Sequence, residues 1–204
     1  MPIFSSSESL PPPADVRDAV VSVSAGLPKK DWPVLFDALD QIDAPNRRVI
    51  IGMTTGHEDV PGDLARMCEE LANPPLLQVN VVRSDVLALL SRTAVMIYTL
   101  RPDVRLGMPM SIADALCAGC SLIVPDRPDA LSYAGPNARP YRTADEIAAH
   151  VREVLGGGPA IEREWEENRK FGQARFCDPE TPRRFDEELR AGLARVRSGR
   201  AQAL

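Results

Sequence analysis

The sequence contains little of what several classes of protein require. Its four cysteines and two histidines among 204 residues are too few and too scattered for a disulfide framework or an evident metal site. No apolar run approaches the roughly 20 residues that cross a bilayer, and the opening MPIFSSSESLPPP lacks the charged-then-apolar order of a signal peptide. A formal net charge of −5 gives no general attraction to nucleic acid or anionic lipid. We therefore expect a cytoplasmic globular protein with no transmembrane segment, metal or nucleic-acid partner.

Apolar strands and amphipathic helices alternate along most of the chain. A content of 44% hydrophobic and 26% charged residues is enough for one well-filled domain. Strands are expected at residues 19–24, 48–53, 77–82, 95–100, 121–124 and 139–141, and helices at 31–42, 61–71, 84–92, 129–133 and 144–155, besides one that begins near 109. This alternation predicts the α/β class, with a doubly wound parallel sheet.

The two ends of the chain differ from the middle. A polar, proline-rich lead-in occupies residues 1–13 and resembles a flexible linker. The α/β domain is expected over 14–158, followed by C-terminal helices over 159–204 that pack on the same domain. Two charged helices are predicted there, at 162–175 and 183–197, with Pro182 beginning the second. Apolar surface on the last helix could alternatively drive dimerisation.

Residues 106–126, LGMPMSIADALCAGCSLIVPD, predict a loop, a helix and a strand buried on both faces. Gly119 is expected to end the helix, and Asp114 is the only acidic residue on it. In an α/β sheet, the N-terminus of such a helix offers backbone N–H groups to a phosphate. A carboxylate one to two turns further along could accept hydrogen bonds from sugar hydroxyls.

These residues resemble the donor-binding element of retaining glycosyltransferases of the GT-B fold, family 4 type, written E-G-F-G-x-x-x-x-E-A-x-x-x-G. Gly107, Ala115 and Gly119 match the pattern, and Asp114 replaces the second glutamate. The sequence departs from the pattern at three places, which are Leu106 for the first glutamate, Met108 for phenylalanine and Pro109 for the second glycine. The resemblance implies donor contacts from Gly107, Met108, Ser111 and Asp114, on the Rossmann-like half of a GT-B fold.

Two other segments are similar to the same family. Residues 21–31 resemble its strand ending in G-R-L followed by a lysine, with Ala25 at the arginine position and Lys30 at the lysine. The resemblance implies that Lys30 is catalytic and neutralises the departing diphosphate. Lys29 takes this role if the register slips by one, and an ordinary solvated loop lysine is the alternative.

Residues 79–86 resemble the strand, turn and helix around the nucleotide base, which implies that Val82 and Arg83 lie near the base. We expect Ser84 in this segment to cap the following helix.

The resemblance implies a glycosyltransferase donor domain that binds a nucleotide-diphosphate sugar, with no cofactor and no metal indicated. The acceptor domain of such an enzyme, which precedes the donor domain, is absent from this chain, so the isolated chain is expected to be inactive. Its expected partners are the nucleotide sugar and either the missing N-terminal acceptor domain or a second copy of the chain. Two alternatives stay open, which are a catalytically degenerate module that binds a nucleotide, a glycan or a protein, and an unrelated flavodoxin-like domain.

Three short motifs have competing interpretations. Cys117 and Cys120 form a C-x-x-C pattern, for which packing between helix and strand is favoured over a redox or zinc site. Asp103 is a substitute for the missing first glutamate if its loop bends, and the neighbouring Arg101 or Arg105 could pair with phosphate. The run DRPD at 126–129 either lines the cleft or forms a turn.

Overall fold

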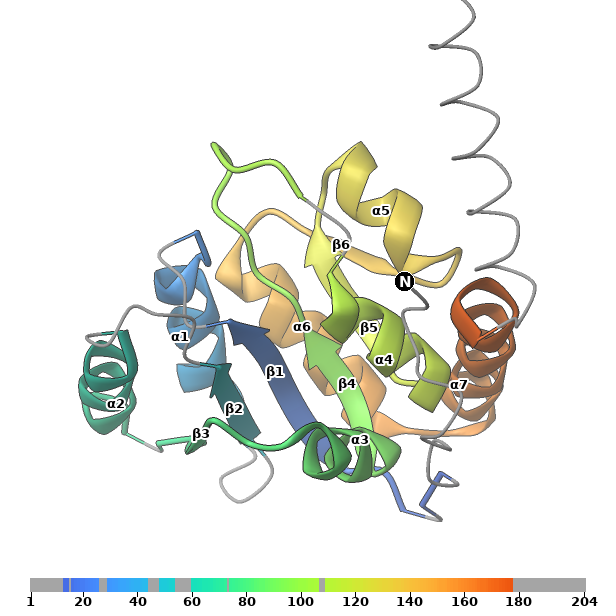
Figure 1. Cartoon of the computed structure of the whole chain (residues 1–204), viewed down its shortest axis with the longest axis horizontal. Helices are drawn as coiled ribbons and strands as arrows, with labels where there is room; N and C mark the ends of the chain where they lie inside the picture. The colour runs from blue at the N-terminus through green and yellow to red at the C-terminus, as the bar shows by residue number, and fades with distance from the viewer. Residues whose placement is uncertain are drawn as a thin grey trace, which may run out of the picture.

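A six-stranded sheet with only parallel neighbours forms the centre of the protein (Figure 1). The computed structural model describes residues 13–14, 16–25, 29–43, 48–53, 60–72, 74–106 and 109–177. The strands are β1 (Ala19–Ala25), β2 (Arg48–Met53), β3 (Leu76–Val79), β4 (Thr93–Ile97), β5 (Ser121–Pro125) and β6 (Arg139–Tyr141). Their order across the sheet is β3-β2-β1-β4-β5-β6, which confirms the predicted doubly wound α/β class.

The strand order reverses between β1 and β4. From β1 the chain moves outward through β2 to β3, then returns to place β4 on the other side of β1. The connections that leave the carboxyl ends of β1 and β4 therefore diverge, and in open parallel sheets ligands bind in the crevice at this point. The fold thus brings the segment before residue 32 and the segment after residue 97 to one edge of the sheet.

Helices cover both faces of the sheet. They are α1 (Trp32–Asp40), α2 (Val60–Glu69), α3 (Arg83–Ser91), α4 (Met110–Ala118), α5 (Pro128–Ala134), α6 (Ala144–Gly156) and α7 (Pro159–Gly172), followed by the π-helical turn η1 (Gln173–Cys177). One hydrophobic layer, called the α3–α4 layer, contains buried residues of α3, α4, α5 and η1. The layer on the other face, called the α1–α6 layer, contains buried residues of helices α1, α2 and α6. Figure 1 shows α6 behind the sheet. Every residue of β4 and β5 is buried, as the apolar run at 121–124 predicted.

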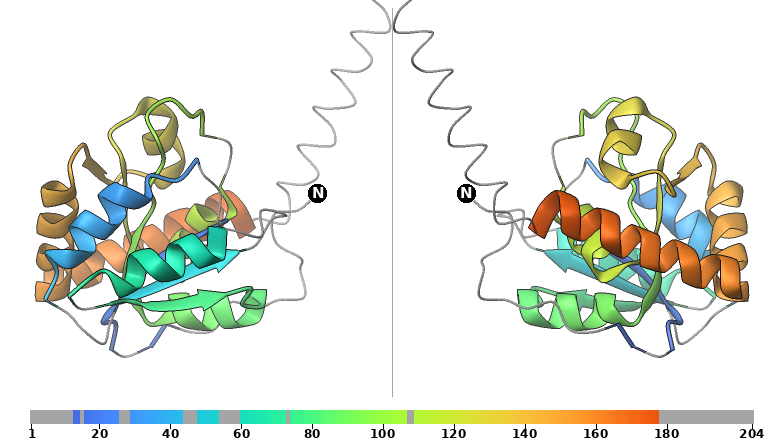
Figure 2. Two further views of the ribbon diagram at one scale, coloured as in Figure 1. Left: turned by 90° about the vertical axis from the view of Figure 1, so that its left-hand side faces the viewer. Right: turned by 90° about the vertical axis from the view of Figure 1, so that its right-hand side faces the viewer.

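Helix α7 crosses from one layer to the other, past the amino ends of β4 and β5. Ile161, near its start, belongs to the α1–α6 layer, whereas Phe171, near its end, packs on the α3–α4 layer. Between them, the indole N–H of Trp165 donates a 3.0 Å hydrogen bond to the carbonyl of Ala94. Figure 2 shows α7 running along the side of the molecule. The helix thereby fastens the C-terminal segment to both layers.

Glycines make the contact between α4 and α7 possible. A Cβ atom on Gly172 would lie 2.5 Å from the backbone carbonyl carbon of Leu116, so the two backbones touch where the helices cross. Gly119 ends α4 in the left-handed conformation, with φ of 83°, as expected from the sequence. A Cβ there would lie 2.7 Å from the carbonyl oxygen of Trp165. Both positions therefore favour glycine.

Several boundaries of the sequence prediction were wrong. The fourth strand, β4, covers Thr93–Ile97 rather than residues 95–100. The third strand ends at Val79 rather than at residue 82, because Asn80 adopts a positive φ of 55° and turns the chain. Helix α3 therefore begins at Arg83, and its N-cap is Val82, with no side-chain hydrogen bond. Ser84 lies inside the helix and is not the cap.

Some predicted features lie outside the described residues. They are the lead-in apart from Pro13, and the helix at 183–197. No helix in the described part of the chain is both long and apolar enough to cross a bilayer.

Candidate functional site

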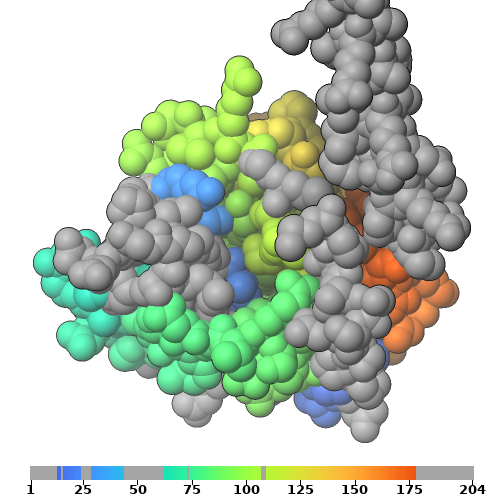
Figure 3. Space-filling model, in the orientation of Figure 1, coloured from blue at the N-terminus to red at the C-terminus, as the bar shows by residue number. Residues whose placement is uncertain are grey.

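Lys30 lies at the carboxyl edge of the sheet, between β1 and α1. Its side chain is buried, and its Nζ lies 3.4 Å from the centre of the Tyr98 ring, which follows β4. The backbone N–H of Arg101 donates a 3.0 Å hydrogen bond to the carbonyl of Lys29. Figure 3 shows the segment after β4, in yellow-green, against the blue residues that precede α1. The structure thus places Lys30 where the strand order reverses.

The buried position changes the acidity of Lys30. Burial, together with the nearby charge of Lys29, lowers its pKa to about 7. The face of the Tyr98 ring attracts the ammonium form and opposes this shift in part. The amine is therefore poised near neutral pH, and an anion bound beside it would favour its charged form. Such a group suits contact with a phosphate.

Asp114 and Arg83, both predicted at the donor site, form an ion pair. The Arg83 guanidinium donates a 2.8 Å hydrogen bond to Oδ1 of Asp114. The Asp114 side chain is only 7% exposed and that of Arg83 is 35% exposed, so the carboxylate is held away from most water. The pair joins α3 to α4, which come before and after β4 in the chain. A charge-assisted hydrogen bond of this kind holds a buried carboxylate in a fixed orientation.

Helix α4 begins without a side-chain cap. Its N-cap is Pro109, whose carbonyl accepts hydrogen bonds from the N–H groups of Ile112 and Ala113. Ser111 lies half-buried in the first turn, and Asp114 follows one turn after Met110. A helix start of this kind carries positive partial charge and suits an anion. Gly107 and Met108, also predicted to contact the donor, lie outside the described residues.

An arginine clamp fixes the segment between β4 and α4. The Arg127 guanidinium donates to the carbonyl of Val104 at 2.7 Å and to the Asp129 carboxylate at 2.7 Å. Asp129 in turn accepts a 3.2 Å hydrogen bond from the backbone N–H of Leu106. The 126–129 run therefore braces the segment that leads to α4.

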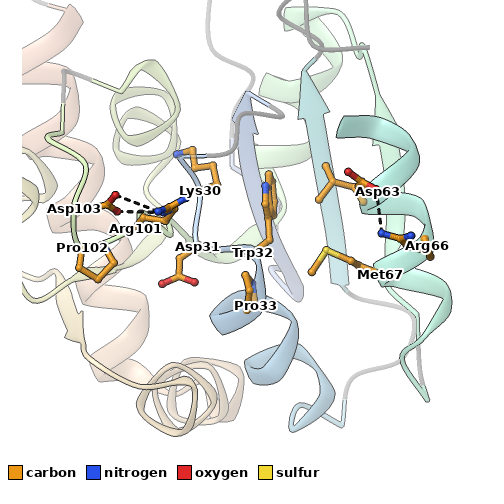
Figure 4. A pocket seen from close by; sticks show the side chains of 11 residues that line it. Lys30, Asp31, Trp32, Pro33, Asp63, Arg66, Met67, Arg101, Pro102 and Asp103 are labelled. Carbon is orange, nitrogen blue, oxygen red and sulfur yellow. Dashed lines mark hydrogen bonds and ion pairs between the residues drawn. The ribbon is translucent and has the colours of Figure 1, made fainter. Parts of the chain in front are cut away.

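A cavity of about 620 Å³ opens beside Lys30 (Figure 4). The start of α1, one face of α2 and the segment 101–103 form its walls. Two exposed ion pairs lie in these walls, Arg66 with Asp63 and Arg101 with Asp103, each with a nitrogen–oxygen distance of 3.1 Å. Asp103, considered as a replacement for the missing glutamate, is thus paired with Arg101 at the cavity wall.

The two cysteines of the C-x-x-C pattern pack in the α3–α4 layer, which is the interpretation favoured from the sequence. Both side chains are buried, and the Cys120 thiol donates to the carbonyl of Leu90 at 3.4 Å. Within the described ranges, no group of three histidine, cysteine, aspartate or glutamate side chains is arranged to hold a metal ion.

Sequence reasoning missed two residues that shape this edge of the sheet. Tyr98 lies under Lys30, and its hydroxyl at the end of an apolar strand was the available signal. Arg127 forms the clamp, but the sequence showed only a charged turn after a strand. The partners of a long side chain depend on tertiary packing, which residue order alone does not give.

Comparison with known proteins gives a likeness in fold. No family model and no curated protein matches the sequence. Among solved structures, HepE of Anabaena in complex with UDP superimposes with a TM-score of 0.71 at 16% identity, covering 86% of this chain and 49% of that one. The catalytic domain of cholesterol-alpha-glucosyltransferase from Helicobacter pylori gives a TM-score of 0.60 at 14% identity, over 76% and 98% of the two chains.

A third structure extends the likeness. The pneumococcal O-GlcNAc transferase GtfA, in complex with UDP and GlcNAc, matches with a TM-score of 0.63 at 14% identity, over 91% of this chain and 38% of that one. The chain has the fold of a GT-B glycosyltransferase domain. It spans less than half the length of HepE and of GtfA. The GT-B domain fold expected from the sequence resemblance is therefore confirmed.

Proposed function

We propose that this GT-B domain binds the donor, a nucleotide-diphosphate sugar, for a retaining glycosyltransferase of family 4 type. The observation that carries the proposal is the Arg83–Asp114 pair, a buried and oriented carboxylate on the helix that follows β4. Lys30 lies at the end of the neighbouring strand, across the point where the strand order reverses. Two of the similar structures are complexes with UDP.

In this proposal Asp114 binds the ribose. Arg83 occupies one side of Oδ1, and a carboxylate can accept about four hydrogen bonds. In the proposal the guanidinium holds Asp114 in place while the carboxylate accepts hydrogen bonds from sugar hydroxyls. Because its side chain is 7% exposed, hydrogen bonds there are stronger than they would be in water. Arg83 acts as the positioning group and lies near the base.

The diphosphate would bind between Lys30 and the start of α4. Negative charge grows on the leaving diphosphate as the bond to the sugar breaks, and a buried ammonium stabilises that charge. Lys30 is suited to this because its side chain is buried and its Nζ lies over the Tyr98 ring. Backbone N–H groups in the first turn of α4, including that of Ser111, supply the second contact. Gly107 and Met108 complete the proposed donor contacts.

Transfer requires an acceptor held in the same cleft. We propose that a second domain, or a second copy of this chain, supplies the acceptor site, so the isolated domain binds donor without efficient transfer. The competing proposal is a degenerate module that binds without catalysis. It is favoured by the absence of two charged residues of the family pattern, since Leu106 and Ala25 occupy those positions.

The experiment compares UDP with uridine in calorimetric titrations of three variants. Lys30→Ala should weaken the binding of UDP more than the binding of uridine, because only UDP carries the diphosphate. Asp114→Asn should weaken both ligands alike, by about 1.5–3 kcal/mol, because it removes charge-assisted bonds to the ribose. The exposed Asp37, in the body of α1, provides the control Asp37→Asn. Unchanged affinity in a folded Asp114→Asn variant would exclude Asp114 from the site.

A further inference from the structure

Two free cysteines from distant parts of the chain lie in contact. The Sγ atoms of Cys117, in α4, and Cys177, at the end of η1, are 3.2 Å apart. A disulfide bond is about 2.05 Å long. The two sulfur atoms would therefore have to approach by little more than 1 Å to form one. The contact lies in the α3–α4 layer, next to the crossing of α4 and α7 at Gly172.

We propose that Cys117 and Cys177 form an oxidation site, which closes to an intramolecular disulfide when the protein meets a hydroperoxide. Cys177 is half-buried and accessible to a small oxidant, whereas Cys117 is 1% exposed. The two residues therefore have different roles. Cys177 reacts first with the oxidant, and Cys117 resolves the product.

The chemistry balances in two steps. The Cys177 thiolate attacks one oxygen of the hydroperoxide, forming a sulfenic acid and releasing an alcohol, or water in the case of hydrogen peroxide. The Cys117 sulfur then attacks the Cys177 sulfur and displaces hydroxide, which leaves as water with the Cys117 proton. The protein loses two hydrogen atoms in total, and one equivalent of peroxide is reduced.

The surroundings of the other cysteines exclude them from this reaction. Cys68 is buried in the α1–α6 layer, and burial raises its pKa to about 11. Cys120 is fully buried and its thiol donates to Leu90, with burial raising its pKa to about 12. Thiols that are buried and resist ionisation react slowly with peroxide. Burial raises the pKa of Cys117 as well, so its role as the resolving thiol rests on its 3.2 Å contact with Cys177. We therefore expect two of the four thiols to disappear.

The disulfide would fasten the end of η1 to the helix that carries Asp114. Cys117 is one turn further along α4 than Asp114. The bond would close a loop containing all of β5, α5, β6, α6 and α7. Closing so long a loop restricts the unfolded chain. Oxidation is therefore expected to raise the midpoint of thermal unfolding, and dithiothreitol to reverse the rise.

The test treats the folded full chain with hydrogen peroxide near one equivalent, alkylates it in denaturant and maps the tryptic peptides by mass. The expected product is a cross-link between fragments 106–142 and 176–183, because trypsin does not cut the Arg–Pro bonds after 127 and 139, with the titratable thiols falling from four to two. Fragment 106–142 holds both Cys117 and Cys120, so variants must identify the partner. Cys117→Ala should abolish the cross-link and Cys120→Ala, the matched control, should retain it.

Three results would overturn the proposal. These are four thiols that persist after treatment, a cross-link that survives in Cys117→Ala, and sulfinic acid on Cys177 without a cross-link. If Cys117→Ala does not fold, the half-exposed Cys177→Ser replaces it, and this variant should keep all three of its remaining thiols. The proposal does not depend on donor binding, because its readout is the cross-link.

Discussion

Arg83, on α3, and Asp114, on α4, join the helices that precede and follow β4 in the chain. The guanidinium donates a 2.8 Å hydrogen bond to the carboxylate. The pair links the two residues that the proposed function assigns to the base and the ribose. It also explains how an acidic side chain that is 7% exposed remains part of a hydrophobic layer. The same contact therefore serves both the stability of the fold and the geometry of the proposed site.

Removal of Arg83 should destabilise the fold more than removal of both partners. Arg83→Met leaves the Asp114 carboxylate buried without this guanidinium, which we expect to cost about 1–3 kcal/mol. The double variant with Asp114→Asn should recover part of that loss, because no buried charge remains. Urea unfolding of the wild type, both single variants and the double variant measures the coupling. If the losses of unfolding free energy in the two single variants add up to the loss in the double variant, the pair contributes no coupling energy.

Lys30 should lower stability at the pH values where it is charged. Its pKa is about 7 in the folded chain against an ordinary value of 10.5, so between these values the unfolded chain binds more protons and stability rises with pH. Lys30→Met should therefore exceed the wild type in stability at pH 6, on the order of 1 kcal/mol or more, and the difference should shrink toward pH 10. Lys170→Met, at an exposed lysine of α7, is the control, because the charge of Lys29 itself contributes to the pKa of Lys30. A pH-independent difference would contradict the assigned pKa.

Binding of a nucleotide sugar should weaken above neutral pH. UDP-glucose carries a diphosphate that does not titrate in this range, so its affinity reports the protonation of Lys30. Bound diphosphate favours the charged amine, and affinity should fall by up to about tenfold per pH unit above pH 7. Lys30→Arg stays charged throughout. Titrations between pH 6 and 9 should show a slope in the wild type and a flat profile in Lys30→Arg, and equal slopes would separate Lys30 from the diphosphate.

Gly172→Ala should separate α7 from α4. The added Cβ would lie 2.5 Å from the backbone of Leu116, and neither helix backbone can yield without moving. Overpacking of this kind costs about 1–3 kcal/mol. Gly156→Ala provides the matched control, because a Cβ at the end of α6 has no neighbour within 4 Å. If the two variants have equal midpoints of thermal unfolding, the close contact of α7 with α4 does not exclude a side chain at position 172.

Most strands and helices could be predicted from the sequence because their patterns involve residues that are close together in the chain. The buried run at 121–124, the helix-ending Gly119 and the alternation of strands and helices depend on neighbours in the chain, and they lie as expected. The end of β3 does not lie where it was expected. Apolar residues continue after Asn80, although the chain turns there. The strand order also follows from tertiary packing rather than from any local pattern.

The candidate site divides in the same way. Asp114 was singled out as the only acidic residue on an expected helix, and the family resemblance added Lys30 and Arg83. The Arg83–Asp114 pair connects residues 31 positions apart, and the Arg127 clamp reaches 23 positions back to Val104. Such contacts depend on the crossing of separate segments, so they required the three-dimensional arrangement.

Calorimetric titration of the folded wild-type chain with UDP, GDP and ADP tests the central claim most directly. We predict that one of the three diphosphates binds with a single-site isotherm and that its parent nucleoside binds more weakly. That result would support a donor domain and name its base. If the folded chain binds none of them, the account of Lys30 and Asp114 as a donor site is contradicted.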